Sequence, residues 1–267
     1  MKSQAFYNLI LSSLFIIIDK NQPETYEMKK VFFWLKAGLI VLITIPMAVL
    51  TALLLPFNYK GKIYHFMAKI WSKIVLIVFN VKVKVKGIEN LSREKNYIYI
   101  SNHASAMDIP ALICGIPDQI RFLAKQELGK IPLWGWLLKY GGYILIDRRN
   151  PKRAIKSVQK AIERIKSGVS VLVFAEGTRS FDGELLPFKR GGFMLAIKSN
   201  TPVVPVTILG SHKIMRKHKL EINPGTIEII IDKPIQVENF TGREGENQLM
   251  ELTREVIKSN LEKQKVG

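Results

Sequence analysis

Cysteine is almost absent from the 267-residue sequence, which contains only Cys114. An intrachain disulfide is therefore excluded, and a reducing compartment such as the cytosol is permitted. The four histidines, His65, His103, His212 and His218, are scattered along the chain, and neither an H-E-x-x-H nor a C-x-x-C spacing occurs. These spacings are the usual signatures of bound zinc, so we predict no metal site.

Acidic side chains are also scarce, because 22 Asp and Glu stand against 40 Lys and Arg and leave a formal net charge of +18. Such an excess suits an anionic partner, and charge alone leaves nucleic acid, anionic lipid and a phosphorylated substrate open. Neither a helix-turn-helix signature nor basic residues interleaved with an aromatic stacking surface is present, so we predict no nucleic-acid partner. A basic protein that binds a membrane surface or nucleic acid stays the alternative from another class. Apolar residues form 48% of the chain, which suffices for a large core and excludes general disorder.

Charge of either sign is missing from the nineteen residues 37–55. As a helix rising about 1.5 Å per residue, this run covers roughly the 30 Å of a bilayer core. Pro46 lies in its middle and is expected to kink it, so a bent, half-inserted helix competes with a straight span. Residues 62–79 then combine spaced lysines with apolar faces, which is typical of a helix in the membrane interface.

Ten lysines and no acidic residue lie between Glu27 and Glu89, a bias that holds a segment against anionic headgroups on the cytoplasmic side. We therefore predict a two-helix membrane anchor over residues 28–80, buried in one leaflet of the cytoplasmic membrane. A soluble helical hairpin packed on the main domain is the alternative. Residues 1–27 form an extension to which the sequence assigns no role, because their short apolar run is followed by no signal-peptide cleavage site.

The chain from residue 81 to residue 267 alternates short apolar runs with helical patterns. Strict alternation of Val and Lys over residues 81–86 predicts an edge or half-exposed strand. Further strands are predicted at residues 97–100, 120–124, 143–146, 169–174, 203–208 and 226–231, and helices at residues 132–140, 151–167, 192–199 and 247–263. We therefore predict an α/β domain with a mixed, partly parallel sheet flanked by helices, with the site in loops beyond the strand ends.

One of these loops contains a histidine followed five residues later by an aspartate, in the segment SNHASAMD at residues 101–108. The spacing also fits a structural histidine followed by a helix-start aspartate. Residues five apart in one helix point about 140° apart, so we expect His103 in the loop and Asp108 in the first helical turn. Asp108 would then orient the imidazole while its other nitrogen takes a proton from an alcohol. Since no activated Ser or Cys accompanies the pair, direct attack by a substrate hydroxyl is favoured over an acyl-enzyme.

Two more strands end in charged residues, GYILIDR at residues 142–148 and VFAEGTR at residues 173–179. Each fits a surface salt bridge, but Arg148 and Arg179 together could form a fork for a phosphate. The backbone N–H groups of Gly177 and Thr178 could hold an anion or an oxyanion. A fourth segment, PVVPV at residues 202–206, indicates by itself only a rigid start to a strand.

In their order and separations these four segments resemble the four motifs of the glycerolipid acyltransferase family, and they are most similar to those of its bacterial 1-acylglycerol-3-phosphate acyltransferases. The resemblance covers residues 101–206. It implies His103 and Asp108 as the catalytic dyad, and Glu176 and Gly177 as site-shaping residues, with which we group Asn102 and Thr178. It further implies a phosphate site formed by Arg148, Arg179 and Lys125. The acyl-donor side is implied to consist of Val203, Val204, Pro205 and Val206. Leu145 and Ala175 replace a Phe and a Pro that are usual in the family, and neither change removes a chemical group.

The activity implied by the resemblance is transfer of an acyl chain from acyl-CoA or acyl carrier protein to the sn-2 hydroxyl of 1-acyl-sn-glycerol 3-phosphate, which yields phosphatidic acid. Expected partners are the lipid bilayer, lysophosphatidic acid and the acyl thioester donor, with the active site facing the cytoplasm. No metal or prosthetic cofactor is expected. Glycerol 3-phosphate or another lysolipid, such as lyso-ornithine lipid, is the alternative acceptor.

Overall fold

The structure is a computed structural model that describes residues 23–57, 61–131, 134–146, 151–216 and 221–266. Its centre is a sheet of seven strands in the order β1-β7-β6-β2-β5-β3-β4. The strands are β1 (Val81–Lys86), β2 (Ile98–Ser101), β3 (Ile120–Lys125), β4 (Ile144–Ile146), β5 (Ser170–Phe174), β6 (Val203–Leu209) and β7 (Gly225–Ile231). Among these strands only β6 and β7 pair antiparallel, and the other neighbours pair parallel. The predicted mixed, partly parallel sheet is therefore confirmed.

Strand β1 lies at one edge of the sheet, as its alternating sequence predicts. Lys82, Lys84 and Lys86 are exposed, whereas Val81 is buried and packs into the core. Exposed lysines on an edge strand discourage pairing with another chain. The alternation therefore reflects both the burial of one face and the position of the strand at the edge.

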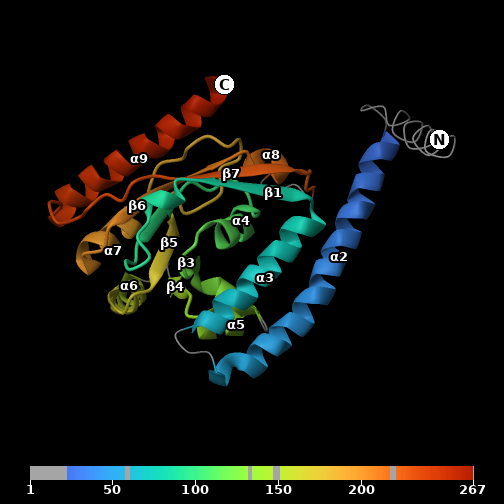
Figure 1. The fold of residues 1–267 in the computed structure, drawn as a ribbon, viewed down its shortest axis with the longest axis horizontal. Coiled ribbons are helices and arrows are strands. Elements are labelled where there is room, and N and C mark those ends of the chain that lie inside the picture. Colours follow the sequence, from blue (N-terminus) through green and yellow to red (C-terminus); the bar gives the residue numbers. More distant parts are fainter. Residues whose placement is uncertain (1–22, 58–60, 132–133, 147–150, 217–220, 267) are drawn as a thin grey trace.

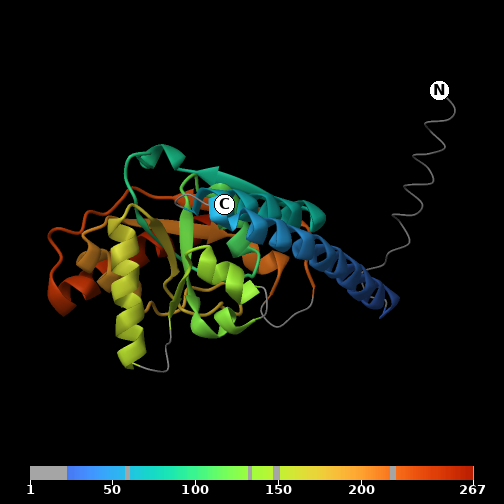
Figure 2. The same cartoon turned by 90° about the horizontal axis from the view of Figure 1, so that it is seen from below.

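Two helical layers cover the sheet, which explains why the central strands are apolar on both faces. Helices α3 (Lys62–Val78) and α4 (Asp108–Gly115) pack on the face that carries Tyr99, Val206 and Ile229. Helices α6 (Pro151–Lys166), α7 (Gly191–Ser199) and α9 (Gly242–Val266) cover the opposite face. Figure 2 shows α6 well apart from the α2–α3 pair. The shorter helices are η3 (Ile88–Asn90), η4 (Gln126–Lys130), α5 (Trp134–Tyr140) and α8 (Ser211–Ile214).

The N-terminal part of the described chain consists of α2 (Pro23–Leu54), the single turn η1 (Leu55–Phe57) and α3, and the two long helices run side by side (Figure 1). Helix α2 continues through Pro46, so this proline does not end it. The stretch Lys30–Phe57 has a mean hydropathy of 2.6 and, among the described residues, is the one helical segment long and apolar enough to cross a membrane. Only 11% of its most apolar window is buried, whereas a helix in a soluble core would be mostly covered.

Candidate active site

The chain leaves the sheet at Asn102, the first residue after the fully buried strand β2. The side-chain amide of Asn102 donates to the Ile208 carbonyl at 2.9 Å, and its oxygen accepts from the Ile208 N–H at 2.8 Å. This pair of bonds fastens the end of β2 to its neighbour β6. Asn102 therefore shapes the site by fixing the point at which the next loop begins.

His103 and Asp108 lie together in that loop, with the His103 Nδ1 2.8 Å from Asp108 Oδ2. Asp108 is the first residue of α4 and is completely buried. Its Oδ2 also accepts the N–H groups of Ala104 at 2.9 Å and Ser105 at 2.8 Å. Three donors thus hold one carboxylate oxygen at the start of a helix, where partial positive charge favours an anion. With Nδ1 engaged, the remaining ring nitrogen, Nε2, is the one able to exchange a proton with a ligand.

The end of strand β5 and the turn after it place Phe174 and Glu176 against His103. Because Phe174 pairs with Ser101 in the sheet register, its ring stacks on the imidazole, with centroids 3.8 Å apart and planes 13° from parallel. The buried carboxylate of Glu176 accepts the His103 N–H at 2.7 Å through Oε1 and the Leu186 N–H at 3.1 Å through Oε2. The His103 carbonyl in turn accepts the Ser180 N–H at 2.8 Å. The backbone of the histidine is therefore fixed at its N–H and at its carbonyl.

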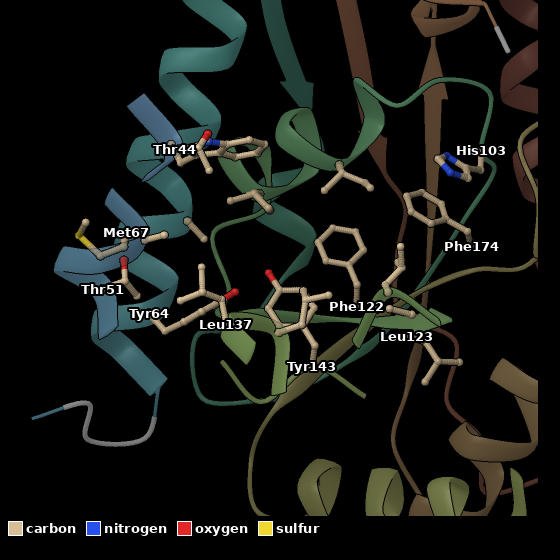
Figure 3. Close-up of a pocket in the computed structure, with 18 of the residues that line it drawn as sticks. Thr44, Thr51, Tyr64, Met67, His103, Phe122, Leu123, Leu137, Tyr143 and Phe174 are labelled. Carbon is tan, nitrogen blue, oxygen red and sulfur yellow. The ribbon is translucent and has the colours of Figure 1, made fainter. Parts of the chain in front are cut away.

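A cavity of about 460 Å³ extends from His103 to the N-terminal helices. Figure 3 shows His103 and Phe174 at one end, Phe122, Tyr143 and Leu137 in the middle, and Thr44, Thr51 and Met67 at the other end. The lining is mostly apolar. A cavity of this shape and polarity suits an extended hydrocarbon chain whose polar end lies beside His103.

The remaining predicted site residues divide into three groups. Gly177, Thr178 and Arg179 line the cavity at the end that holds His103. Arg148 lies outside the described residues, and the side chain of Lys125, at the end of β3, does so too. Of the three residues predicted to bind phosphate, Arg179 is therefore the one whose side chain the structure describes, and its contact with a phosphate stays a prediction.

The predicted donor-side residues occupy β6, and their side chains are enclosed within the sheet. Val203, Val204 and Val206 are completely buried, and neither they nor Pro205 line the cavity. The structure places these side chains in the core, and contact with a donor stays a prediction.

Sequence reasoning missed the residues that complete the cavity. Thr44, Thr51, Tyr64, Met67 and Trp71 come from the two helices predicted only as an anchor. The Trp71 indole N–H donates to Thr44 Oγ1 at 2.9 Å and so links the inner sides of the two helices. A sequence signal did exist, because Thr44 and Thr51 are seven residues apart and interrupt an otherwise apolar run on one helical face.

Comparison with known proteins now bears on this arrangement. Residues 82–209 match the Acyltransferase family. A 1-acyl-sn-glycerol-3-phosphate acyltransferase of Limnanthes douglasii is 36% identical over 205 residues, which cover 76% of this chain and 72% of that protein. The chain belongs to the 1-acyl-sn-glycerol-3-phosphate acyltransferase family. The resemblance inferred from the four motifs is thereby confirmed.

Two further members of the acyltransferase family support the same assignment. A chloroplastic member from Brassica napus is 38% identical over 213 residues, which cover 78% of this chain. The chain spans only 61% of the length of that relative. The crystal structure of the 1-acyl-sn-glycerophosphate acyltransferase PlsC from Thermotoga maritima superposes with a TM-score of 0.74 at 30% identity, and the match covers 90% of this chain and 96% of that chain. The fold of this chain is thus shared with that structure over most of its length.

Proposed function

We propose that this protein transfers an acyl group from an acyl thioester to the sn-2 hydroxyl of 1-acyl-sn-glycerol 3-phosphate and so forms phosphatidic acid. The observation that carries the proposal is an imidazole, bonded to a buried carboxylate, at the end of a long apolar cavity. Relatives named for this reaction cover most of the chain. A proton acceptor next to a hydrocarbon site is what acylation of a lipid alcohol requires.

In the proposed reaction His103 Nε2 takes the proton of the sn-2 hydroxyl as its oxygen attacks the thioester carbonyl carbon. The new C–O bond forms, the C–S bond breaks, and the departing thiolate receives the proton from the imidazolium. Asp108 holds the Nδ1–H tautomer and stabilises the transient positive charge on the ring. The donor is acyl-CoA or acyl carrier protein, and the chemistry uses no metal or prosthetic group.

The acceptor phosphate is proposed to lie beside Arg179, with Thr178 near the reacting carbonyl. The Gly177 N–H donates to the Phe174 carbonyl at 3.0 Å, so we assign it no oxyanion. Arg148 and Lys125 complete this phosphate site in our proposal. The acceptor or donor acyl chain then extends along Phe122 and Tyr143 towards α2 and α3. An acceptor with an acyl chain, rather than glycerol 3-phosphate, makes fuller use of such a cavity.

We further propose that the protein is attached to the cytoplasmic face of a membrane through α2 and α3, which lie in one leaflet. The exposed apolar side chains of α2 and the absence of acidic residues between Glu27 and Glu89 support this location. Cleavage of the α2–α3 connection by protease from the far side of sealed vesicles would exclude a single-leaflet anchor.

The dyad is tested with His103→Ala in the full chain, assayed with one acyl-CoA and 1-acylglycerol 3-phosphate. A positioned base contributes about 100- to 10,000-fold in rate, so kcat should fall within that range while folding and vesicle binding persist. A variant that retains near-normal turnover would refute general-base catalysis by His103.

The phosphate assignment is tested with Arg179→Ala, and Arg190→Ala serves as the matched control because Arg190 is exposed, pairs with Glu246 and lies off the cavity. Arg179→Ala should raise the KM for the acceptor with little change for the donor, and Arg190→Ala should alter neither. A changed donor KM with an unchanged acceptor KM contradicts the assignment. The same assay with glycerol 3-phosphate and lyso-ornithine lipid as acceptors decides between the alternative substrates.

A further inference from the structure

Helix α5 has two apolar faces that point in different directions. Leu137 and Leu138 are buried and line the cavity. Trp136 and Tyr140, one helical turn apart, are each 50% exposed, and their rings meet edge to face with centroids 4.8 Å apart. Burial of Leu137 and Leu138 explains the inner face, whereas two large aromatic side chains on the outer face of a short helix need another explanation.

The chain just before α5 continues this exposed apolar surface. Leu128 in η4 and Ile131 after it are both exposed. Lys130 and Lys139 are exposed as well and flank the apolar side chains. Tryptophan and tyrosine favour the headgroup level of a bilayer, and lysines beside them reach anionic headgroups with their long side chains.

This surface lies next to α2, because α2 and α5 are in contact. Leu35, Leu39, Leu42, Ile45, Val49 and Leu53 of α2 are all exposed. The cavity lies between the same elements, since Thr44, Met47, Ala48 and Thr51 of α2 face Leu137 and Leu138 across it. Figure 1 shows α5 beside the C-terminal end of α2.

We propose that η4 and α5 form a second membrane-contacting element, which rests on the same leaflet as α2. Lipid acyl chains would then pass sideways from the leaflet into the cavity at the junction of α2 and α5, without crossing water. The membrane contact stands on the exposed surface alone, whereas the sideways passage rests on the proposed acyltransferase function. A lipid surface is the occupant that fits, because the patch lies beside a helix apolar enough to span a bilayer and carries two exposed lysines, Lys130 and Lys139, against one exposed acidic residue, Glu127.

Membrane contact is tested with single-cysteine probes, since Cys114 is the only native cysteine. In a Cys114→Ser background, an environment-sensitive fluorophore is attached at Tyr140→Cys, at Leu42→Cys on α2, and at Leu252→Cys on α9. Leu252 is the matched control because it is 41% exposed on the opposite side of the sheet. Vesicles of phosphatidylglycerol and phosphatidylcholine with brominated acyl chains should quench the probes at positions 42 and 140 and spare the probe at position 252.

Quenching at position 42 but not at position 140 overturns the proposal, because α5 would then face water. A blue shift at position 140 that occurs without vesicles and grows with protein concentration overturns it too, because the patch would be covered by a second copy of the chain. These outcomes require no acyl transfer, so they remain informative even if the proposed reaction is wrong.

The sideways passage is tested with Trp136→Glu combined with Tyr140→Glu, and Leu252→Glu is the control. Neither Trp136 nor Tyr140 lines the cavity. The double variant should lose about tenfold or more of its rate on 1-acylglycerol 3-phosphate in vesicles and keep its rate in detergent micelles, whereas the control keeps both. Equal losses in vesicles and micelles would contradict a role in access from the leaflet. Absence of transfer by the wild-type protein in both assays refutes the proposed function instead.

Discussion

Glu176 is a buried carboxylate whose two oxygens accept backbone N–H groups. Burial raises its pKa from 4.5 to about 7, even though N–H donation from His103 and Leu186 opposes the rise and the charge of Asp108 adds to it. The folded protein therefore binds this proton more tightly than the unfolded chain does. Stability contributed by the proton is complete below pH 4.5 and is lost as the pH rises through 7.

Replacement of this carboxylate should remove that pH dependence. We expect the free energy of unfolding of the wild-type protein to fall by roughly 3 kcal/mol more than that of Glu176→Gln between pH 4.5 and pH 8. Denaturant unfolding of both proteins in the same detergent, at several pH values, measures the difference. Identical pH profiles would show that Glu176 does not titrate in this range.

Site residues that are close together in the sequence could be predicted, whereas contacts between distant segments of the chain could not. His103 and Asp108 are near neighbours, so helix geometry alone placed one in the loop and the other at the helix start. The stacking of Phe174 on His103 depends instead on the pairing of β2 with β5, which are separated by about seventy residues of chain. Contacts set by strand order are invisible until the order is known.

Gly61, the residue directly before α3, packs closely against strand β3. Gly61 has a φ of 72°, and its carbonyl accepts a hydrogen bond at 3.0 Å from the buried guanidinium of Arg121 on β3. A Cβ at Gly61 would lie 2.3 Å from that guanidinium. A hydrogen bond thus links the start of α3 to β3.

Gly61→Ala should therefore destabilise the protein by about 1–3 kcal/mol, because it strains the backbone and displaces a buried charge. Gly38→Ala is the matched control, since its added Cβ meets nothing within 4 Å and alanine favours the helix. Thermal unfolding of both variants in micelles measures the effect. Equal midpoints for Gly61→Ala and the wild type would mean that the turn relaxes without cost.

Two adjacent residues of helix α2 point in different directions, one into the cavity and one to the outside of the protein. Ala48 is buried and lines the cavity, whereas Val49 is exposed. Ala48→Phe should shorten the cavity and shift the preference towards shorter acyl chains, and Val49→Phe should leave the preference unchanged. Competition between donors, and then between acceptors, of graded chain length measures the shift. An unchanged preference in Ala48→Phe would show that the reacting chains lie elsewhere.

The positions of the strands along the chain were predictable, whereas their order and direction in the sheet were not. All seven strands arose near their predicted positions, because β1 alternates apolar and charged residues and the other strands contain short apolar runs, and both patterns are local in sequence. Strand β7 lies between β1, with which it pairs parallel, and β6, with which it pairs antiparallel, and this placement depends on contacts far apart in sequence. Helix α9 begins at Gly242 rather than at residue 247, because its polar first turn lacks an apolar period.

Across the whole molecule, the net charge of +18 should make membrane association sensitive to salt. We expect binding to vesicles that contain anionic lipid to weaken as ionic strength rises, and binding to neutral vesicles to be weaker and nearly constant. Co-sedimentation with the two kinds of vesicle measures both. Equal salt responses would show that apolar insertion alone governs attachment.

The position of α2 and α3, exposed on one side and lining the cavity on the other, has a practical consequence for purification of this protein without detergent. Deletion of residues 1–80 would remove the proposed membrane anchor. It would also remove Met47, Tyr64 and Trp71, which form one wall of the cavity in which the acyl chain of the substrate is proposed to lie. In the truncated protein the cavity would be open to water. Replacement of the exposed apolar residues of α2 by polar ones, with its cavity-lining residues unchanged, is the better route to a water-soluble protein.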